Sequence, residues 1–171
     1  MSKERRTVSL SLLVREWMTP VLLLSMAINV RAECFQQAAD YYQVPEILLR
    51  AIARHESGMN PEALHVNANG SRDIGLMQIN TRWLPELAHM GIREQDLWDP
   101  CTNIFVGAWV LANNLRRSKG DVWQAVGAYN AGWRESPVHD RRRADYAERI
   151  KRMVRKLLTS ARKAAASGGA G

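Results

Sequence analysis

Apolar residues recur every three or four positions through most of the chain, and this helical spacing restricts its fold more than any other feature. The sequence contains no internal repeat and no run of alternating apolar and polar residues long enough to form a large sheet. A length of 171 residues suits one compact domain and is too short for two large ones. The sequence therefore predicts a mainly α fold in a single domain.

Proline, glycine and acidic residues indicate where the helices begin and end. Val44-Pro45-Glu46 places proline and an acid in the first turn of one helix, which should end near Ser57-Gly58. Asp99-Pro100 begins another, which Lys119-Gly120 ends. We expect helices over residues 35–42, 45–57, 83–90, 100–119, 122–130 and a last one from about 146 to 158.

Residues 65–80 break the helical pattern. They contain a turn signal, Asn67-Ala-Asn-Gly70, followed by a short segment that partly alternates between polar and apolar residues. We expect a loop or small hairpin there. The Ala-, Ser- and Gly-rich tail, residues 161–171, is expected to be disordered.

The N-terminus has the pattern of an export signal. Lys3, Arg5 and Arg6 precede an apolar run that begins at Pro20 and is shorter than the roughly 20 residues that span a bilayer as a helix. We expect residues 1–32 to be a signal peptide cleaved after Ala32, which would place the mature protein in the periplasm. An uncleaved anchor is the alternative.

Two cysteines, Cys34 and Cys101, follow the signal peptide. In an exported chain an even number of cysteines favours a disulfide over a metal site, and two unpaired buried thiols are the alternative. The four histidines show no metal-ligand spacing with one another or with the cysteines. We therefore expect no metal.

Net charge is +7, and 11 of the 24 lysines and arginines lie between Arg134 and Lys163. Aromatic residues are not interleaved with them, so a solvated helix face is favoured over a nucleic-acid patch. The basic excess would suit an anionic cell-wall polymer. We expect a monomer that binds no nucleic acid.

Glu56 is the strongest catalytic candidate from position alone. It lies four residues after Ile52, at the C-terminal end of a predicted helix, so its carboxyl falls on or near the buried face. Burial would raise its pKa and keep it protonated, ready to donate a proton. Glu56 could instead cap the following loop or pair with Arg50 or Arg54.

Three short motifs appear in order after this point. His55-Glu-Ser-Gly-Met-Asn-Pro61-Glu-Ala63, Gly75-Leu-Met-Gln78 and Ala128-Tyr-Asn-Ala-Gly132 closely resemble the three motifs of the soluble-type (SLT) lytic transglycosylases, and Tyr146 stands where that family has a further tyrosine. The resemblance covers almost the whole mature chain, from about Cys34 to Leu158.

The resemblance implies a lysozyme-like α fold of the goose-lysozyme or SLT type over residues 33–160. It also implies cleavage of the peptidoglycan β-1,4 bond between N-acetylmuramic acid and N-acetylglucosamine, with 1,6-anhydromuramyl ends and without a cofactor. Glu56 would act as acid and then base, and Ser57 would position it. Met77, Gln78, Tyr129 and Asn130 would line the sugar subsites, with Tyr146 hydrogen-bonding toward Glu56.

For some of these residues a structural role is equally open. Met77 and Tyr129 could pack in the core, and Asn130 could cap the helix before Gly132. Among the tryptophans, Trp133 is the best candidate for stacking on a sugar because it adjoins the third motif.

Asp73 departs from the commonest family pattern. Asp73-Ile-Gly-Leu-Met-Gln-Ile-Asn80 also resembles the animal-type lysozymes, in which this aspartate is the second catalytic carboxylate. In lysozyme, two carboxylates take different catalytic roles because their environments differ. Asp73 could instead stabilise the turn after Gly70 through backbone hydrogen bonds.

Three function classes follow. The first is a transglycosylase of the small kind that opens the wall for a secretion, conjugation or pilus machine, a role that rests on analogy with the family. A hydrolytic lysozyme that uses Glu56 and Asp73 is the alternative within the enzyme class. A non-catalytic peptidoglycan-binding component is the third, and the presence of Glu56, Gln78 and Asn130 argues against it.

Overall fold

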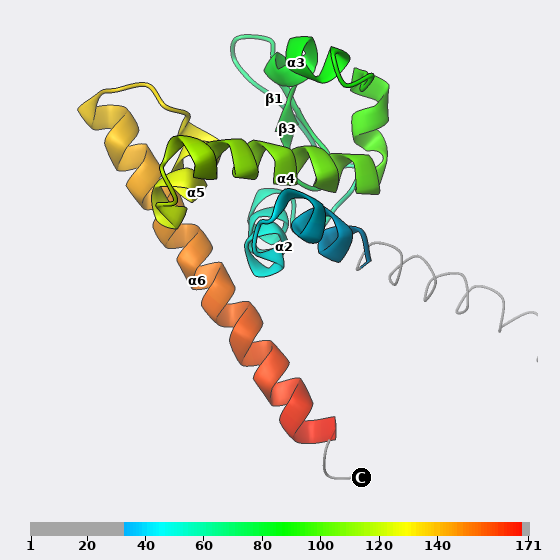
Figure 1. The fold of residues 1–171 in the computed structure, drawn as a ribbon, viewed down its shortest axis with the longest axis vertical. Coiled ribbons are helices and arrows are strands. Elements are labelled where there is room, and N and C mark those ends of the chain that lie inside the picture. The colour runs from blue at the N-terminus through cyan, green and yellow to red at the C-terminus, as the bar shows by residue number, and fades with distance from the viewer. Residues whose placement is uncertain (1–32, 169–171) are drawn as a thin grey trace, which may run out of the picture. The chain divides into compact units, whose positions relative to one another are not determined.

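The computed structural model describes residues 33–168, and it confirms the mainly α fold (Figure 1). The predicted signal peptide lies outside the described residues. Residues 33–42 are helical. The elements that follow are α2 (Glu46–Glu56), β1 (Leu64–Val66), β2 (Arg72–Ile74), β3 (Ile79–Asn80), the 3-10 helix η1 (Thr81–Trp83), α3 (Leu84–Ala88), the 3-10 helix η2 (Glu94–Trp98), α4 (Pro100–Arg117), α5 (Val122–Ala131) and α6 (Pro137–Gly168).

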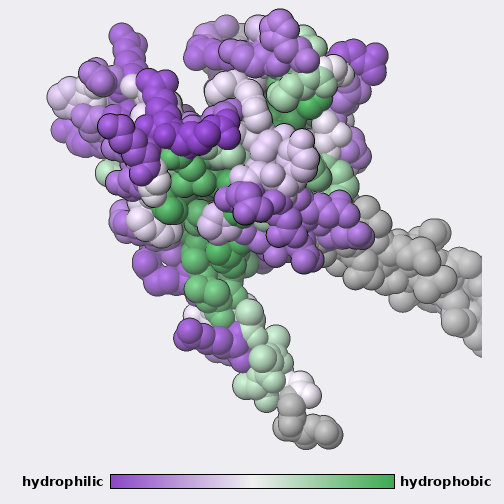
Figure 2. Space-filling model, viewed as in Figure 1, coloured by the Kyte–Doolittle hydropathy of each residue, from purple (hydrophilic) through white to green (hydrophobic). Residues whose placement is uncertain are grey.

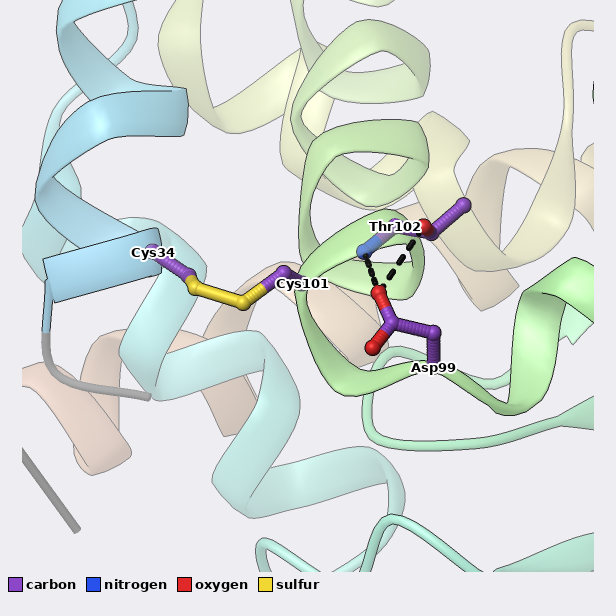
Figure 3. Close-up of a disulfide and its surroundings, with 4 residues drawn as sticks. All are labelled: Cys34, Asp99, Cys101 and Thr102. Atoms are coloured by element: carbon purple, nitrogen blue, oxygen red, sulfur yellow. Dashed lines mark hydrogen bonds between the residues drawn. A yellow bond between two sulfur atoms is a disulfide. The ribbon is translucent and has the colours of Figure 1, made fainter. Parts of the chain in front are cut away.

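The long helix α4 begins at a strong cap. Asp99 accepts hydrogen bonds at Oδ1 from the backbone nitrogen of Thr102 (2.8 Å) and from its hydroxyl (2.9 Å), and Pro100 occupies the first turn (Figure 3). At the same end, the predicted disulfide is confirmed: Cys34 and Cys101 are bonded, with their Cα atoms 5.4 Å apart. The disulfide therefore ties the first described helix to the start of α4.

One hydrophobic core joins the helices. Helix α4 contacts α2, α5 and the 3-10 helix η2, while α6 packs on α2 and α5. Gly127 of α5 permits a close approach to α6, because a Cβ there would lie 2.5 Å from the carbonyl oxygen of Arg143. The largest side chains without solvent exposure in this core include Phe35, Leu49, Ile52, Leu76, Met77, Leu87, Leu97, Ile104 and Leu111.

The predicted hairpin is present as a three-stranded antiparallel sheet in the order β1-β2-β3. Asp73 on β2 pairs with His65 of β1 and with Asn80 of β3. The turn between β1 and β2 is closed by the backbone nitrogen of Asn67, which donates to the carbonyl of Ser71 (2.8 Å). Gly70 adopts φ +81°, the left-handed conformation that its position in the turn requires.

Helix α6 corrects two predictions. It begins at Pro137, earlier than the periodicity indicated, and it continues to Gly168, so most of the tail expected to be disordered is helical. The physical reason is composition: from Ala161 to Ala166 the tail contains only alanine, arginine and lysine, which have high helix propensity and continue an existing helix. None of the helices among residues 33–168 has the length and apolarity needed to span a membrane.

Candidate active site

A groove of about 840 Å³ runs between the small sheet and the ends of α2 and α5. Its lining is polar and draws on segments that are distant in the sequence. The residues that line it are Glu56, His65, Asn67, Ala68, Asn69, Ser71, Asp73, Gln78, Ile79, Asn80, Arg82, Trp83, Val110, Tyr129, Asn130 and Arg142. Five residues singled out from the sequence, Glu56, Asp73, Gln78, Tyr129 and Asn130, therefore meet in one groove.

Glu56 is the last residue of α2, and its carboxyl is half-buried against α6. The hydroxyl of the buried Tyr146 donates a hydrogen bond to Oε1 of Glu56. Burial raises the pKa of Glu56, with a smaller contribution from the negative charge of Asp73; the Tyr146 hydrogen bond and the positive charge of Arg149 act in the opposite direction. The net result is a carboxyl biased toward the protonated form.

The segment that follows β2 is held by a buried asparagine on α4. Asn103 is 1% exposed, and its amide nitrogen donates to the carbonyls of Ile74 and Leu97, each at 2.8 Å. Its amide oxygen accepts from the backbone nitrogen of Met77 at 2.7 Å. Gly75 adopts φ +75°, and a Cβ there would lie 2.5 Å from Nδ2 of Asn103. Only glycine fits this position, for both conformational and steric reasons.

Three successive carbonyls of this segment accept hydrogen bonds from side chains of the three motifs. Gln78 Nε2 donates to Gly75 at 2.9 Å, Ser57 Oγ to Leu76 at 2.9 Å, and Tyr129 Oη to Met77 at 3.0 Å. The backbone of residues 75–77 therefore fixes the positions of the end of α2, the hairpin and α5 relative to one another. Burial raises the pKa of Tyr129 well above its usual value, so its hydroxyl stays protonated and able to donate.

Two of the residues singled out from the sequence, Met77 and Ser57, are absent from the lining of the groove. Met77 is fully buried and does not line the groove; its side chain packs on Gly107 of α4, where a Cβ would approach it within 2.7 Å. The open alternative of core packing is the one that the structure shows for Met77. Ser57 does not line the groove either, since its hydroxyl lies 3.2 Å from the carbonyl of Ala53 and 2.9 Å from that of Leu76.

Asp73 projects from β2 into the groove, where two asparagine side chains hold it. Asn67 Nδ2 donates to Oδ2 at 2.9 Å, and Asn80 Nδ2 donates to Oδ1 at 2.6 Å. Hydrogen bonds to both oxygens fix the orientation of the Asp73 carboxyl group. Glu56 and Asp73 therefore meet the groove in different environments: Glu56 is partly buried beside Tyr146, and both oxygens of Asp73 accept hydrogen bonds from asparagine side chains.

The aromatic side chain in the groove differs from the one favoured by the sequence. Trp133 does not line it; its indole nitrogen donates to Asn114 at 2.8 Å, and the guanidinium of Arg117 lies 5.0 Å from its ring centroid. Trp83 lines the groove instead and packs edge-on against Trp109, with the ring centroids 5.3 Å apart. Trp133 adjoins the third motif in sequence, but its indole nitrogen is hydrogen-bonded to Asn114 of α4.

Sequence reasoning missed the asparagines that organise this site. Asn103 lies on the same face of α4 as Gly107 and Leu111, so an amide among apolar residues was the available signal. Asn67 and Asn80 flank Asp73 along the hairpin, but their pairing depends on strand register, which the sequence alone left open. The cationic residues Arg82 and Arg142 also line the groove without a sequence signal.

The Glu56 carboxyl is placed to transfer a proton to a molecule bound in the groove. A carboxyl that burial biases toward the protonated form can donate to a leaving oxygen, and the oxygen that Tyr146 does not hold is available for that transfer. Polar side chains along the groove can bind hydroxyl and amide groups of a saccharide.

Comparison with known proteins finds one matching domain family and relatives that are about 40% identical in sequence. The sequence profile of the transglycosylase SLT domain matches residues 33–154. The invasion protein IagB of Salmonella typhimurium is 42% identical over 139 residues, which cover 80% of this chain and 85% of that protein. Protein IpgF of Shigella flexneri is 41% identical over 133 residues, which cover 77% of this chain and 86% of that protein.

Two solved structures share the fold at lower identity. Lytic transglycosylase Slt of Pseudomonas aeruginosa superposes with a TM-score of 0.59 at 22% identity, over 74% of this chain and 24% of that one. The 70 kDa soluble lytic transglycosylase of Escherichia coli gives a TM-score of 0.58 at 23% identity, with the same coverage of both chains. The chain thus spans about a quarter of each of these larger proteins.

Proposed function

Since the chain belongs to the transglycosylase SLT domain family, we propose that it cleaves the β-1,4 bond between N-acetylmuramic acid and N-acetylglucosamine in peptidoglycan and leaves 1,6-anhydromuramyl ends. The observation that carries this proposal is the position of the Glu56 carboxyl in the groove, together with its raised pKa. Burial of the carboxyl causes the rise. We assign the catalytic domain to residues 33–160.

Glu56 acts twice in the proposed reaction. The protonated carboxyl first donates its proton to the glycosidic oxygen, and the bond between that oxygen and C1 of the muramyl residue breaks. The resulting carboxylate then takes the proton of the C6 hydroxyl as that oxygen bonds to C1. The substrate's acetamido group supports the intermediate, and Glu56 ends the cycle protonated.

The neighbours of Glu56 position it for both steps. Tyr146 holds Oε1, which leaves Oε2 to exchange the proton with the sugar. Ser57 fastens the end of α2 to residues 75–77, and Tyr129 fastens α5 to the same segment. Gln78 and Asn130 also line the groove and would bind sugar hydroxyl or acetamido groups.

A hydrolytic lysozyme is the second candidate because Asp73 shares the groove with Glu56. An ionised Asp73 could stabilise positive charge at C1 or assist a water molecule. Its two oxygens already accept hydrogen bonds from Asn67 and Asn80, which supports a second role in holding the hairpin. The reaction product distinguishes the two candidates.

We further propose that residues 1–32 direct export to the periplasm, where peptidoglycan lies, and that the enzyme opens the wall locally for a secretion, conjugation or pilus machine. The support is the disulfide between Cys34 and Cys101, which suits an oxidising compartment, and the description of IagB as an invasion protein. Components of such an envelope-spanning machine would be partners of the chain.

The test is a digest of purified peptidoglycan by residues 33–171, beside the Glu56→Gln variant, with mass spectrometry of the released muropeptides. We expect anhydro ends, lighter by one water than reducing ends, and none from the variant. Reducing ends would establish the lysozyme reaction and give Asp73 a catalytic role. Equal release by both proteins would overturn the enzymatic proposal.

A further inference from the structure

Helix α6 continues well beyond the part that the core covers. Ile150 is fully buried, and Met153, Val154 and Leu157 still pack against the core. Leu158 is 46% exposed, and every residue from there to Gly168 is exposed. In Figure 1 the C-terminal half of α6 extends past the other helices of this unit. An amphipathic helix in this position has an apolar face without a described partner.

The two faces of this extension differ in chemistry. Its apolar stripe continues that of the packed part at spacings of three and four, through Leu157, Leu158, Ala161 and Ala165, and Figure 2 shows a hydrophobic surface that continues along α6. The opposite face carries cations, and the sequence from Arg149 to Gly168 contains no aspartate or glutamate. The cations of the extension are Arg152, Arg155, Lys156, Arg162 and Lys163, whereas Lys151 is paired with Glu148.

A groove of about 860 Å³ adjoins this helix on the side of α2. Met153 and Leu157 supply its apolar part, and Arg152, Arg155 and Lys156 its cationic part. Arg54 of α2 adds a further cation, and no acidic residue lines the groove. Apolar surface beside several cations is the combination that an anionic amphiphile requires.

We propose that this C-terminal basic surface, Arg54 together with residues 151–168, binds the surface of an anionic phospholipid bilayer. Cations on one face attract the headgroups, while the leucines and alanines enter the boundary between headgroups and acyl chains.

Charge and side-chain size favour a bilayer over other occupants. A second copy of the chain would bring an equally basic helix, so like charges oppose a dimer through this face. A protein partner binds through large anchoring side chains, whereas the stripe beyond Leu158 offers mainly alanine. A bilayer needs only one apolar and one cationic face.

The proposal is tested by sedimentation of residues 33–171 with phospholipid vesicles. This segment contains the whole described core and the disulfide, and it omits the predicted signal peptide, which could itself bind lipid. We expect binding to vesicles of phosphatidylglycerol and phosphatidylcholine to be about tenfold stronger than to phosphatidylcholine alone. High salt should weaken it.

Charge-reversal variants locate the surface. Arg155→Glu with Lys156→Glu should weaken binding to the anionic vesicles about tenfold or more. The control, Arg134→Glu with Arg141→Glu, changes net charge equally at exposed positions outside the proposed surface and should bind as the parent does. Leu158→Gln should weaken binding several-fold without a change of charge. Circular dichroism verifies that each variant is folded.

Three results would overturn the proposal. Equal binding to both vesicle types would remove the electrostatic argument, and equal loss in the control pair would show that net charge alone matters. If neither vesicle binds but a synthetic amphipathic helix of leucine and glutamate does, the surface serves an acidic protein instead. The vesicle assay is independent of glycan cleavage, so its failure would leave the proposed function standing.

Discussion

The hydroxyl of Tyr146 donates a hydrogen bond to Oε1 of Glu56, which lies 90 positions earlier in the chain. The tyrosine is 1% exposed and sits in the part of α6 that packs on α2. Burial raises the pKa of Glu56, and this hydrogen bond partly offsets the rise because it stabilises the carboxylate. The pair therefore sets both the orientation and the proton affinity of the proposed catalytic group.

Removal of this hydroxyl should change rate and pH dependence together. In Tyr146→Phe we expect the rate of peptidoglycan cleavage to fall about tenfold or more, because a hydrogen bond to a charged group is lost. Glu56 must be protonated to act, so activity falls as pH rises through its pKa. The variant's pKa is higher, and the basic limb of its pH profile should move to higher pH. Tyr42→Phe, away from the groove, is the control; an unmoved limb would contradict the assignment.

Replacement of Asp73 should shift the basic limb of the pH–activity profile to lower pH, opposite to the shift expected for Tyr146→Phe. The negative charge of Asp73 contributes to the raised pKa of Glu56, so Asp73→Asn should lower that pKa and shift the basic limb of the pH profile to lower pH. The variant should also be less stable by about 1–2 kcal/mol, since an amide nitrogen would face the donors of Asn67 and Asn80.

The control for this change is Glu135→Gln, which removes one negative charge at an exposed position. Urea unfolding measures stability, and the pH profile of muropeptide release measures the pKa. An unchanged profile in Asp73→Asn would show that Asp73 acts only on the hairpin.

Glu56 should reduce stability at neutral pH. Its folded pKa is raised above the unfolded value, so the folded state favours the protonated form, and stability falls as pH rises through that range. Glu56→Gln removes this penalty. We expect its melting temperature to exceed the parent's by about 2 °C or more near pH 8, with the difference lost near pH 4.

Calorimetry at the two pH values measures the difference, and Glu62→Gln, an exposed carboxyl, serves as the control. A variant that melts below the parent at high pH would show that Glu56 stabilises the fold, contrary to its proposed environment.

Alanine substitutions at two glycines should distinguish the cost of backbone strain from the cost of a steric clash. Gly75 and Gly70 adopt similar positive φ values, +75° and +81°, but a Cβ at Gly75 would meet Asn103, whereas one at Gly70 would meet nothing within 4 Å. Gly70→Ala should therefore cost about 1 kcal/mol and Gly75→Ala about 2 kcal/mol more. Urea unfolding measures both, and equal costs would contradict the contact with Asn103.

Several features of the fold could be predicted because their causes are local. The start of α4 follows from a capping aspartate and a proline, and its end precedes Lys119-Gly120. The disulfide was expected from two cysteines in a chain for which an export signal is predicted, and the loop or hairpin from the turn at Asn67 to Gly70. The tail was misjudged because its serine and glycine content was given more weight than its alanines.

The amino-acid sequence by itself determined the helical architecture, the disulfide pair and five of the residues that meet in the groove, namely Glu56, Asp73, Gln78, Tyr129 and Asn130. Periodicity and capping act over a few residues, and motif order needs no coordinates. Only the tertiary structure decided that Met77 packs in the core, that Trp83 and not Trp133 lines the groove, and that Asn103 holds the segment after β2. These outcomes depend on contacts between segments far apart in the chain, where burial and strand register are set by the whole fold.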